Sequence, residues 1–301
     1  MNVNGKEVKV MHDVFYFTDI HGARPLFDAI MNYCHEEDNE AMIIFGGDAI
    51  DRGQDGYAIM KELLDNPYVV YLKGNHEDMF TKAAREIKDN FNLENADRER
   101  IETCLNNCKN FDYRYSAIQD SLYNGGLSTL TDWVLDGMPM DIVERIEHLP
   151  LTFTYNNMDF CHAGSIYKSF KTVADLEYAG KEIPSWDSDH LIWSRTTLGI
   201  GWAPGRMCIF GHTPTPYLSE YIDKFEWPVD YEITPVMYER ENEFMPDMAG
   251  RKLDMDTGAV FTGRAFVLNV LTMKAYGFED NDLNNKEISK HDVEKIDCIQ
   301  F

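Results

Sequence analysis

Three short apolar stretches near the start of the chain have the composition of buried β-strands. They cover residues 13–18, 41–45 and 68–72. The segments between them carry apolar residues at helical spacing, first at 26–34 and then at 57–64. Strand–helix–strand units of roughly 30 residues join parallel strands through right-handed crossovers. The pattern therefore predicts an α/β fold in which three parallel strands end at the same edge of a sheet.

Residues 78–148 lack strand character and show helical spacing instead. We expect helices around 83–88, 98–108, 113–122 and 127–135, with breaks at Asn124-Gly125-Gly126 and at Gly137. We interpret this segment as a helical insertion that lies beside the functional site as a partial lid. The insertion elaborates a single domain that spans residues 1–301.

Strand patterns return after the insertion, at 151–155, 158–161, 207–210, 256–261 and 265–271. Asn156-Asn157 predicts a hairpin turn between the first two of these strands. Residues 217–248 contain several prolines and exposed aromatics and predict a loop excursion. Residues 279–301 form a strongly charged tail that either covers a sheet edge or frays.

The composition describes a globular protein with a strong negative charge. The chain has 301 residues, 44% of them hydrophobic, and a formal net charge of −24. Such a surface repels bulk nucleic acid and anionic membranes. The 6 cysteines are scattered, and the chain carries neither a signal-peptide pattern nor a long apolar run. We therefore expect a cytoplasmic protein, in which any phosphorylated substrate would have to be captured by a locally positive site. The sequence leaves the oligomeric state open.

Polar residues follow five of the predicted strands, at the point where ligands gather in open α/β sheets. These strand-end residues are Asp19, His21, Asp48, Asn75, His162 and His212. Two carboxylates, three imidazoles and an amide oxygen suit divalent metals such as Mn, Fe or Zn. Asp48 follows the middle strand of the first three, so its carboxylate is placed to bridge two ions. Two metals held in this way can promote an in-line displacement at phosphorus.

Less specific interpretations apply to several of these residues. A single histidine after a strand is more often an ordinary surface or core residue than a ligand, and only the surrounding motifs favour metal binding by His162 and His212. Arg195 is either a surface residue or an anion binder, and we favour the second. Asp256 could be a ligand, could orient a histidine or could form a turn, and we favour the last two. Cys104 and Cys108 lie one helical turn apart without a second pair that would complete a zinc site.

The motifs resemble those of a known family. Thr18-Asp19-Ile20-His21-Gly22, Gly47-Asp48-Ala49-Ile50-Asp51-Arg52-Gly53 and Gly74-Asn75-His76-Glu77 are similar to the three signature motifs of the phosphoprotein phosphatases among the calcineurin-like metallophosphoesterases. His162-Ala163-Gly164, Trp193-Ser194-Arg195, Gly211-His212-Thr213-Pro214 and Asp256-Thr257-Gly258-Ala259-Val260-Phe261 resemble later motifs of the bacterial and bacteriophage branch, of which the lambda phage phosphatase is typical. The resemblance implies a two-sheet β-sandwich flanked by helices.

The resemblance also implies a role for each residue of the site. Asp19 and His21 would bind one metal, Asn75, His162 and His212 the other, and Asp48 would bridge them. Arg52 and Arg195 would hold the phosphoryl oxygens, because a guanidinium matches their geometry. His76 would be the general acid, with Asp51 as the carboxylate that favours its imidazolium form. Two divalent ions are implied, with Mn²⁺ favoured over Fe or Zn.

The expected function is metal-dependent hydrolysis of phosphomonoesters on Ser/Thr phosphoproteins, by direct attack of a metal-bound hydroxide. One alternative keeps this chemistry and acts on the phosphoanhydrides of dinucleoside polyphosphates or capped RNA. Another is a catalytically silent protein that binds phosphate or a partner, which an eroded ligand set would have favoured. No ligand position is eroded in this sequence.

Overall fold

Two six-stranded sheets form the centre of the molecule. This computed structural model describes residues 2–3, 6–7, 12–109, 115–164, 191–195, 206–217, 236–239, 251–280, 288–293 and 297–300. In spatial order, the first sheet consists of β13 (Ile288–Val293), β12 (Lys274–Asp280), β11 (Arg264–Asn269), β3 (Val14–Phe17), β4 (Met42–Phe45) and β5 (Val69–Tyr71). The second sheet consists of β14 (Asp297–Gln300), β9 (Val236–Glu239), β10 (Arg251–Asp254), β8 (Met207–Phe210), β7 (Met158–Cys161) and β6 (Thr152–Tyr155). The short strands β1 (Asn2–Val3) and β2 (Lys6–Glu7) pair with each other.

The three strands predicted to be parallel are confirmed, because β3 pairs in parallel with β4 and β4 with β5. In the second sheet, β7 and β8 are also parallel, and β6 and β7 form the predicted hairpin at Asn156-Asn157. The α/β fold class with two mixed sheets and flanking helices is thus confirmed.

Strand β3 shows how the sequence builds two layers of core. Alternate side chains of a strand point to opposite faces. Val14 and Tyr16 belong to the apolar cluster between the sheets, with Phe160 of the second sheet. Phe15 and Phe17 belong to the cluster beneath the helices. All four β3 side chains are buried, which explains why the strand is apolar along its whole length.

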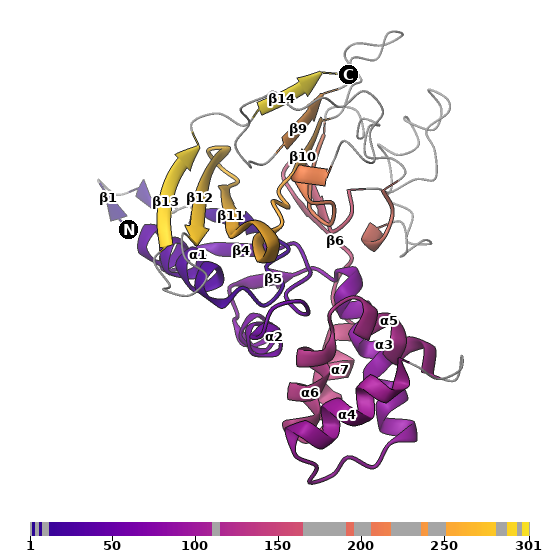
Figure 1. The fold of residues 1–301 in the computed structure, drawn as a ribbon. Helices are drawn as coiled ribbons and strands as arrows, with labels where there is room; N and C mark the ends of the chain where they lie inside the picture. Colours follow the sequence, from indigo (N-terminus) through magenta and orange to yellow (C-terminus); the bar gives the residue numbers. More distant parts are fainter. Residues whose placement is uncertain are drawn as a thin grey trace, which may run out of the picture.

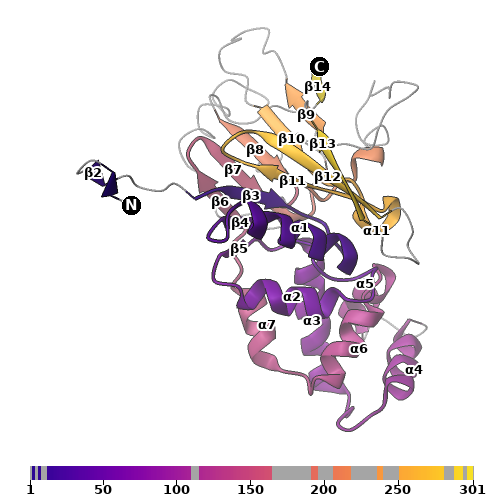
Figure 2. The same cartoon turned by 90° about the vertical axis from the view of Figure 1, so that its left-hand side faces the viewer.

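The described helices are α1 (Arg24–Glu37), α2 (Gly56–Asp65), α3 (Asn75–Asn90), α4 (Arg98–Cys108), α5 (Ser116–Tyr123), α6 (Leu127–Leu135), α7 (Met140–Glu147), the 3-10 turn η2 (Thr215–Tyr217) and α11 (Ala259–Thr262). Among them, α1 and α2 lie against the first sheet, and α3 to α7 form a helical lobe at one end of the molecule. Figure 1 and Figure 2 both show α3 to α7 gathered below the sheets. Phe80 and Trp133 of this lobe belong to the same apolar cluster as Phe17. The lobe therefore shares a continuous core with the sheet.

Several expectations about local structure are wrong. Residues 256–261 form a turn and helix α11, because Gly258 has φ +72 and its N–H donates to the Asp256 carboxylate at 2.8 Å. The helix expected at 83–88 starts earlier, at Asn75. Helix α7 and the strands β10 and β12 lie where no element was expected.

The predicted loop excursion and tail are only partly described. Within 217–248, Val236–Glu239 form strand β9, which pairs with β10, while 218–235 and 240–248 lie outside the described residues. In the tail, Ile288–Val293 pair with β12 and Asp297–Gln300 pair with β9. None of the described helices is both long and apolar enough to cross a bilayer.

Candidate metal centre and active site

The strand ends bring four of the predicted residues, His21, Asn75, His162 and His212, together around the Asp48 carboxylate. Asp48 Oδ2 lies 3.3 Å from His162 Nε2 and 3.6 Å from His21 Nε2. Asn75 Oδ1 lies 3.1 Å from the same His162 Nε2. The rings of His162 and His212 are neighbours, with centroids 5.0 Å apart. All of these side chains are buried, so the cluster lies in a region of low dielectric constant.

Two groups within this cluster have donor atoms close enough to hold a metal ion. One group consists of His21, Asp48 and His76, and the other of Asp48, His162 and His212. In each group the donor atoms lie within 4.8 Å of one another. Asp48 belongs to both groups, which is the arrangement that a bridging carboxylate requires. His76, expected as a general acid, lies in the first group.

Hydrogen bonds to backbone carbonyls fix which nitrogen of each ring can bind a metal. His21 Nδ1 is 2.8 Å from Ile50 O, and His162 Nδ1 is 2.9 Å from Gly46 O. A carbonyl oxygen only accepts, so these Nδ1 atoms carry the proton and the lone pair lies on Nε2. His212 has the reverse arrangement, because its Nε2 donates to Trp193 O at 3.1 Å. In metal sites, hydrogen bonds of this kind to the nitrogen that does not bind the metal orient each histidine ligand. The three rings are therefore held as ligands of divalent ions would be.

Asp19 lies beside these groups, and hydrogen bonds from nearby residues hold its carboxylate in place. Its Oδ2 accepts the Thr18 hydroxyl at 2.6 Å and the His212 N–H at 3.1 Å. A Cβ at Gly211 would lie 2.0 Å from the same oxygen, so the position requires glycine. The contact between Asp19 and His212 joins the end of β3 to the end of β8.

The charges of the cluster depend strongly on one another. Burial alone would raise the pKa of Asp48, but His162, His76 and His21 hold that pKa well below its usual value. Burial raises the pKa of Asp19 to about 6, although His162 opposes this shift. The pKa of His162 rises to about 10, because Asp48 and Asp19 outweigh the effect of burial. Burial together with nearby positive groups lowers the pKa of His21 and His212 well below the usual value. The neutral rings of His21 and His212, together with the ionised carboxylate of Asp48, are suited to a cation.

The predicted catalytic residues border this cluster. Asp51 Oδ2 accepts the His76 Nδ1–H at 2.7 Å, so Nε2 of His76 faces the cluster and lies 3.8 Å from Asp48 Oδ2. Burial would lower the pKa of His76, but Asp48 and Asp51 raise it above the usual value. Arg52 Nη1 is 2.6 Å from His21 Nε2, and Arg52 Nη2 is 3.1 Å from His76 Nε2. Arg195 Nη2 donates to His212 O at 3.1 Å. The two arginines thus contact different parts of the cluster.

The backbone at the site is held in an unusual conformation. Of the ten described non-glycine residues with positive φ, six belong to the predicted site: Asp19, His21, Asp48, Asp51, Arg52 and His212. A non-glycine residue in this region costs about 1–3 kcal/mol. Backbone strain concentrated in this way indicates that the surrounding contacts hold the functional side chains in place.

Glu77 is a residue of the site whose role was not foreseen. Its carboxylate is completely buried and accepts the backbone N–H of Asp48, Ala49 and Gly74 at 2.8–2.9 Å. The Tyr71 hydroxyl donates a fourth bond at 2.8 Å. Its position in the first turn of α3, three residues after Gly74, was the available signal, because an acid there often returns to cap the helix start.

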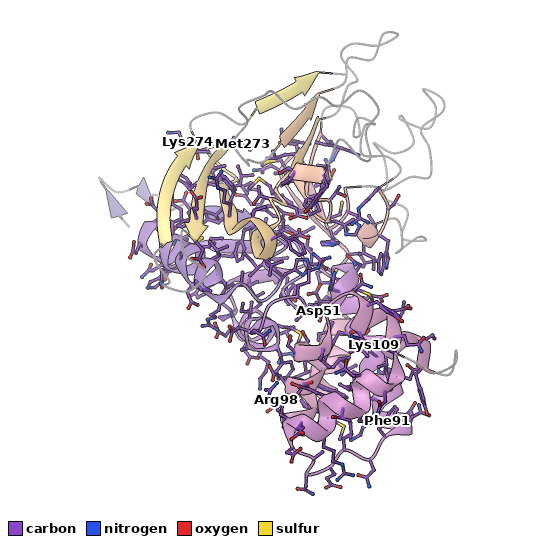
Figure 3. All side chains as sticks on the ribbon, viewed as in Figure 1. Asp51, Phe91, Arg98, Lys109, Met273 and Lys274 are labelled. Carbon is purple, nitrogen blue, oxygen red and sulfur yellow. The ribbon has the colours of Figure 1, made fainter. Side chains whose placement is uncertain are left out.

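Two further features lie next to Arg52. Its guanidinium carbon lies 5.4 Å from the ring centroid of Phe261, a side chain that is 58% exposed. The loop that carries Asp51 and Arg52 also contacts the helical lobe, and Figure 3 shows Asp51 where the sheets join the helices.

Asp256 forms a turn with Gly258, as one of its two favoured interpretations predicted.

Comparisons with known proteins define the family. The model of the calcineurin-like phosphoesterases matches residues 13–233, and the chain belongs to this family. Membership indicates a hydrolase of phosphoesters. A search of curated proteins finds no match.

Three solved structures are similar to this chain. A candidate diadenosine tetraphosphatase has a TM-score of 0.45 and 14% identity, with 94% of each chain covered. A cold-active protein-tyrosine phosphatase of a psychrophilic Shewanella species has a TM-score of 0.43 and 11% identity, with 93% of this chain and 80% of that chain covered. A protein serine/threonine phosphatase from Saccharomyces cerevisiae has a TM-score of 0.40 and 13% identity, with 95% and 81% covered.

Proposed function

We propose that the protein is a dinuclear metal-dependent phosphatase of the bacterial and bacteriophage type, which hydrolyses phosphomonoesters on Ser/Thr phosphoproteins. The observation that carries the proposal is the shared Asp48 carboxylate, which joins the two groups of donors. A single metal would not require a carboxylate between two sets of imidazoles.

In this proposal Asp19 and His21 bind one ion, Asn75, His162 and His212 bind the other, and Asp48 contacts both. The mixture of oxygen and imidazole donors suits Mn²⁺, and Fe or Zn would also fit. Bound ions of this kind supply a nucleophile at neutral pH and neutralise the charge that develops on the phosphoryl group.

The chain itself supplies the remaining steps. Arg52 and Arg195 bind the phosphoryl oxygens, and the contacts of Arg52 with His21 and His76 support this placement. His76 delivers a proton from Nε2 to the leaving oxygen. Asp51 holds the opposite nitrogen of His76 at 2.7 Å and thereby favours the protonated ring.

A second candidate substrate is a dinucleoside polyphosphate or a capped RNA end. The exposed ring of Phe261 beside Arg52 supports it, because a nucleobase can stack on an exposed aromatic ring next to a phosphate-binding group. The same site would then cleave a phosphoanhydride.

The partner is accordingly a phosphorylated protein or a small phosphorylated molecule, and the net charge of −24 disfavours bulk nucleic acid and membranes. A cytoplasmic location is part of the proposal. It is supported by the free thiols of Cys34, Cys104, Cys108, Cys161 and Cys208.

The test is a side-by-side assay of the manganese-loaded protein on a phosphoserine peptide and on diadenosine tetraphosphate, with kcat/KM reported for each. We expect a higher kcat/KM for the peptide. A clear preference for the dinucleotide would replace the Ser/Thr assignment with the second candidate. Silence on both substrates, in a protein that binds manganese, would support a binding protein without catalysis.

A further inference from the structure

The start of helix α6 makes direct hydrogen bonds with the loop that carries Asp51 and Arg52. The Thr129 hydroxyl accepts the Asp51 N–H at 3.1 Å. The Arg52 N–H donates to Gly125 O at 3.0 Å, and the Ser128 hydroxyl donates to Gly53 O at 2.9 Å. Three consecutive residues of the loop are therefore bound to the helical insertion.

The contact is too close to be incidental. Gly125 has φ +91, and a Cβ on it would lie 2.9 Å from the Arg52 backbone nitrogen. The insertion can approach the loop only because it presents a glycine there. Thr129 is itself 1% exposed, so water cannot replace its hydroxyl as a partner of the Asp51 N–H.

The loop held in this way has a conformation that it would not adopt by itself. Asp51 has φ +69 and Arg52 has φ +64, both in the left-handed region. Non-glycine residues keep this conformation only where their surroundings fix it. The bonds from Thr129 and Gly125 end on the N–H groups of these two residues.

The side chain of Asp51 then carries the effect to the proposed general acid. Its Oδ2 binds His76 Nδ1 at 2.7 Å, and its backbone position determines where that oxygen lies. A small shift of the Asp51 backbone would rotate or release the His76 ring. Proton transfer is sensitive to such misplacement, because the donor must lie within hydrogen-bond reach of the leaving oxygen.

We infer that the helical insertion is a working part of the active site and that Thr129 is a positioning residue, which holds Asp51 so that Asp51 can orient His76 for proton transfer. The inference rests on the proposed function for its kinetic consequence. The insertion is thus more than a lid beside the site, because it fixes the backbone of two site residues.

The test compares Thr129→Val with Thr131→Val in the full-length, manganese-loaded protein. Valine replaces a hydroxyl by a methyl group of similar size. Thr131 is a matched control, because it lies on the same helix, is 0% exposed, and its hydroxyl has no hydrogen-bond partner among the described residues. The substrates are p-nitrophenyl phosphate, whose leaving group needs little protonation, and phenyl phosphate, whose leaving group needs more.

We expect Thr129→Val to lower kcat on phenyl phosphate by about tenfold and on p-nitrophenyl phosphate by much less, with KM and manganese content unchanged. Thr131→Val should leave both rates unchanged. Thr129→Ser keeps a hydroxyl and should recover most of the activity that the valine variant loses. Equal kinetics of the two valine variants would overturn the positioning role.

Amide hydrogen exchange provides a second measurement that does not need turnover. Peptides that cover residues 48–56 should exchange faster in Thr129→Val than in Thr131→Val, because only the first variant loses the bond to Asp51. If the wild-type protein binds manganese but hydrolyses neither aryl phosphate, the proposed function fails and this exchange still decides the inference. If Thr129→Val does not fold, Thr129→Ala removes the same hydroxyl and takes its place in both measurements. Unchanged exchange in the variant tested would overturn the inference.

Discussion

The carboxylate of Glu77 accepts the backbone N–H of Asp48, with 2.9 Å between Oε2 and the nitrogen. The same oxygen accepts the Gly74 N–H, while Oε1 accepts the Ala49 N–H and the Tyr71 hydroxyl. Glu77 therefore joins the loop after β4 to the start of α3, and it fixes the backbone from which the central carboxylate projects.

Glu77→Gln should destabilise the protein and weaken metal binding. Each oxygen of Glu77 faces two donors, so the amide NH₂ of glutamine would point at donors whichever way it turned. We expect a loss of about 3 kcal/mol in the free energy of unfolding and a Tm lower by roughly 5–10 °C. Asp89→Asn, on the exposed face of the same helix, is the control in thermal unfolding. A Tm equal to that of the control would refute the role of Glu77.

Asp48→Asn should abolish activity and weaken the binding of both metal ions, because the shared ligand loses its charge. We expect kcat/KM to fall by more than about a hundredfold and the manganese stoichiometry to fall below two. Titration calorimetry and elemental analysis measure the stoichiometry. Asp55→Asn changes an exposed carboxylate in the same segment and should leave both properties unchanged. An undiminished rate in Asp48→Asn would exclude the bridging role.

The sequence indicated which polar residues the structure brings together at the strand ends, because strand patterns and the polar residues after them are local signals. Strands β3 and β4 pair in parallel, and beyond their ends the Asp19 N–H donates to the carbonyl oxygen of Gly47, next to Asp48, at 3.0 Å. Strand β10 had no such signal. Its Lys252 and Asp254 are 1% and 0% exposed, and the alternation of apolar and polar residues cannot reveal a strand that buries its charges. Burial lowers the pKa of Lys252 to about 8.

Contacts between distant segments could not be predicted from the sequence. Thr129 is a common residue of a helix, and its bond to Asp51 spans 78 positions of the chain. The error at 256–261 has a different cause. Ala259, Val260 and Phe261 have strand-like composition, but the flanking Gly258 and Gly263 both adopt positive φ and confine the segment to one helical turn.

His76→Asn should reduce turnover according to the leaving group. We expect kcat on phenyl phosphate to fall by about 10²–10⁴-fold and on p-nitrophenyl phosphate by less, with manganese content retained. Because His76 also lies in a group of candidate ligands with His21 and Asp48, the metal content is the decisive control. Lost manganese together with equal losses on both substrates would make His76 a ligand instead of an acid.

The pH profile should depend on the pair of His76 and Asp51. Burial lowers the pKa of His76, but Asp48 and Asp51 raise it above its usual value of 6.5. The protonated ring is lost as the pH rises through that raised pKa, so kcat on phenyl phosphate should fall on the alkaline side. Asp51→Asn keeps an oxygen that accepts the Nδ1–H but removes the charge, so this alkaline limb should move to lower pH. A limb at the same pH in the variant would show that another group titrates there.

Phe261 should influence the choice of substrate more than stability. Its ring is 58% exposed and lies 5.4 Å from the guanidinium carbon of Arg52, so its loss removes little buried surface. Stacking of one base on an aromatic ring contributes about 1–3 kcal/mol, so Phe261→Ala should lower kcat/KM for diadenosine tetraphosphate by roughly 5- to 150-fold if a base binds there. On a phosphoserine peptide the loss in kcat/KM should be smaller. Phe261→Leu keeps apolar surface but has no aromatic ring. Its kcat/KM should therefore fall as far as that of Phe261→Ala on the dinucleotide, but not on the peptide. Equal losses on both substrates would mean that Phe261 acts only by supporting Arg52.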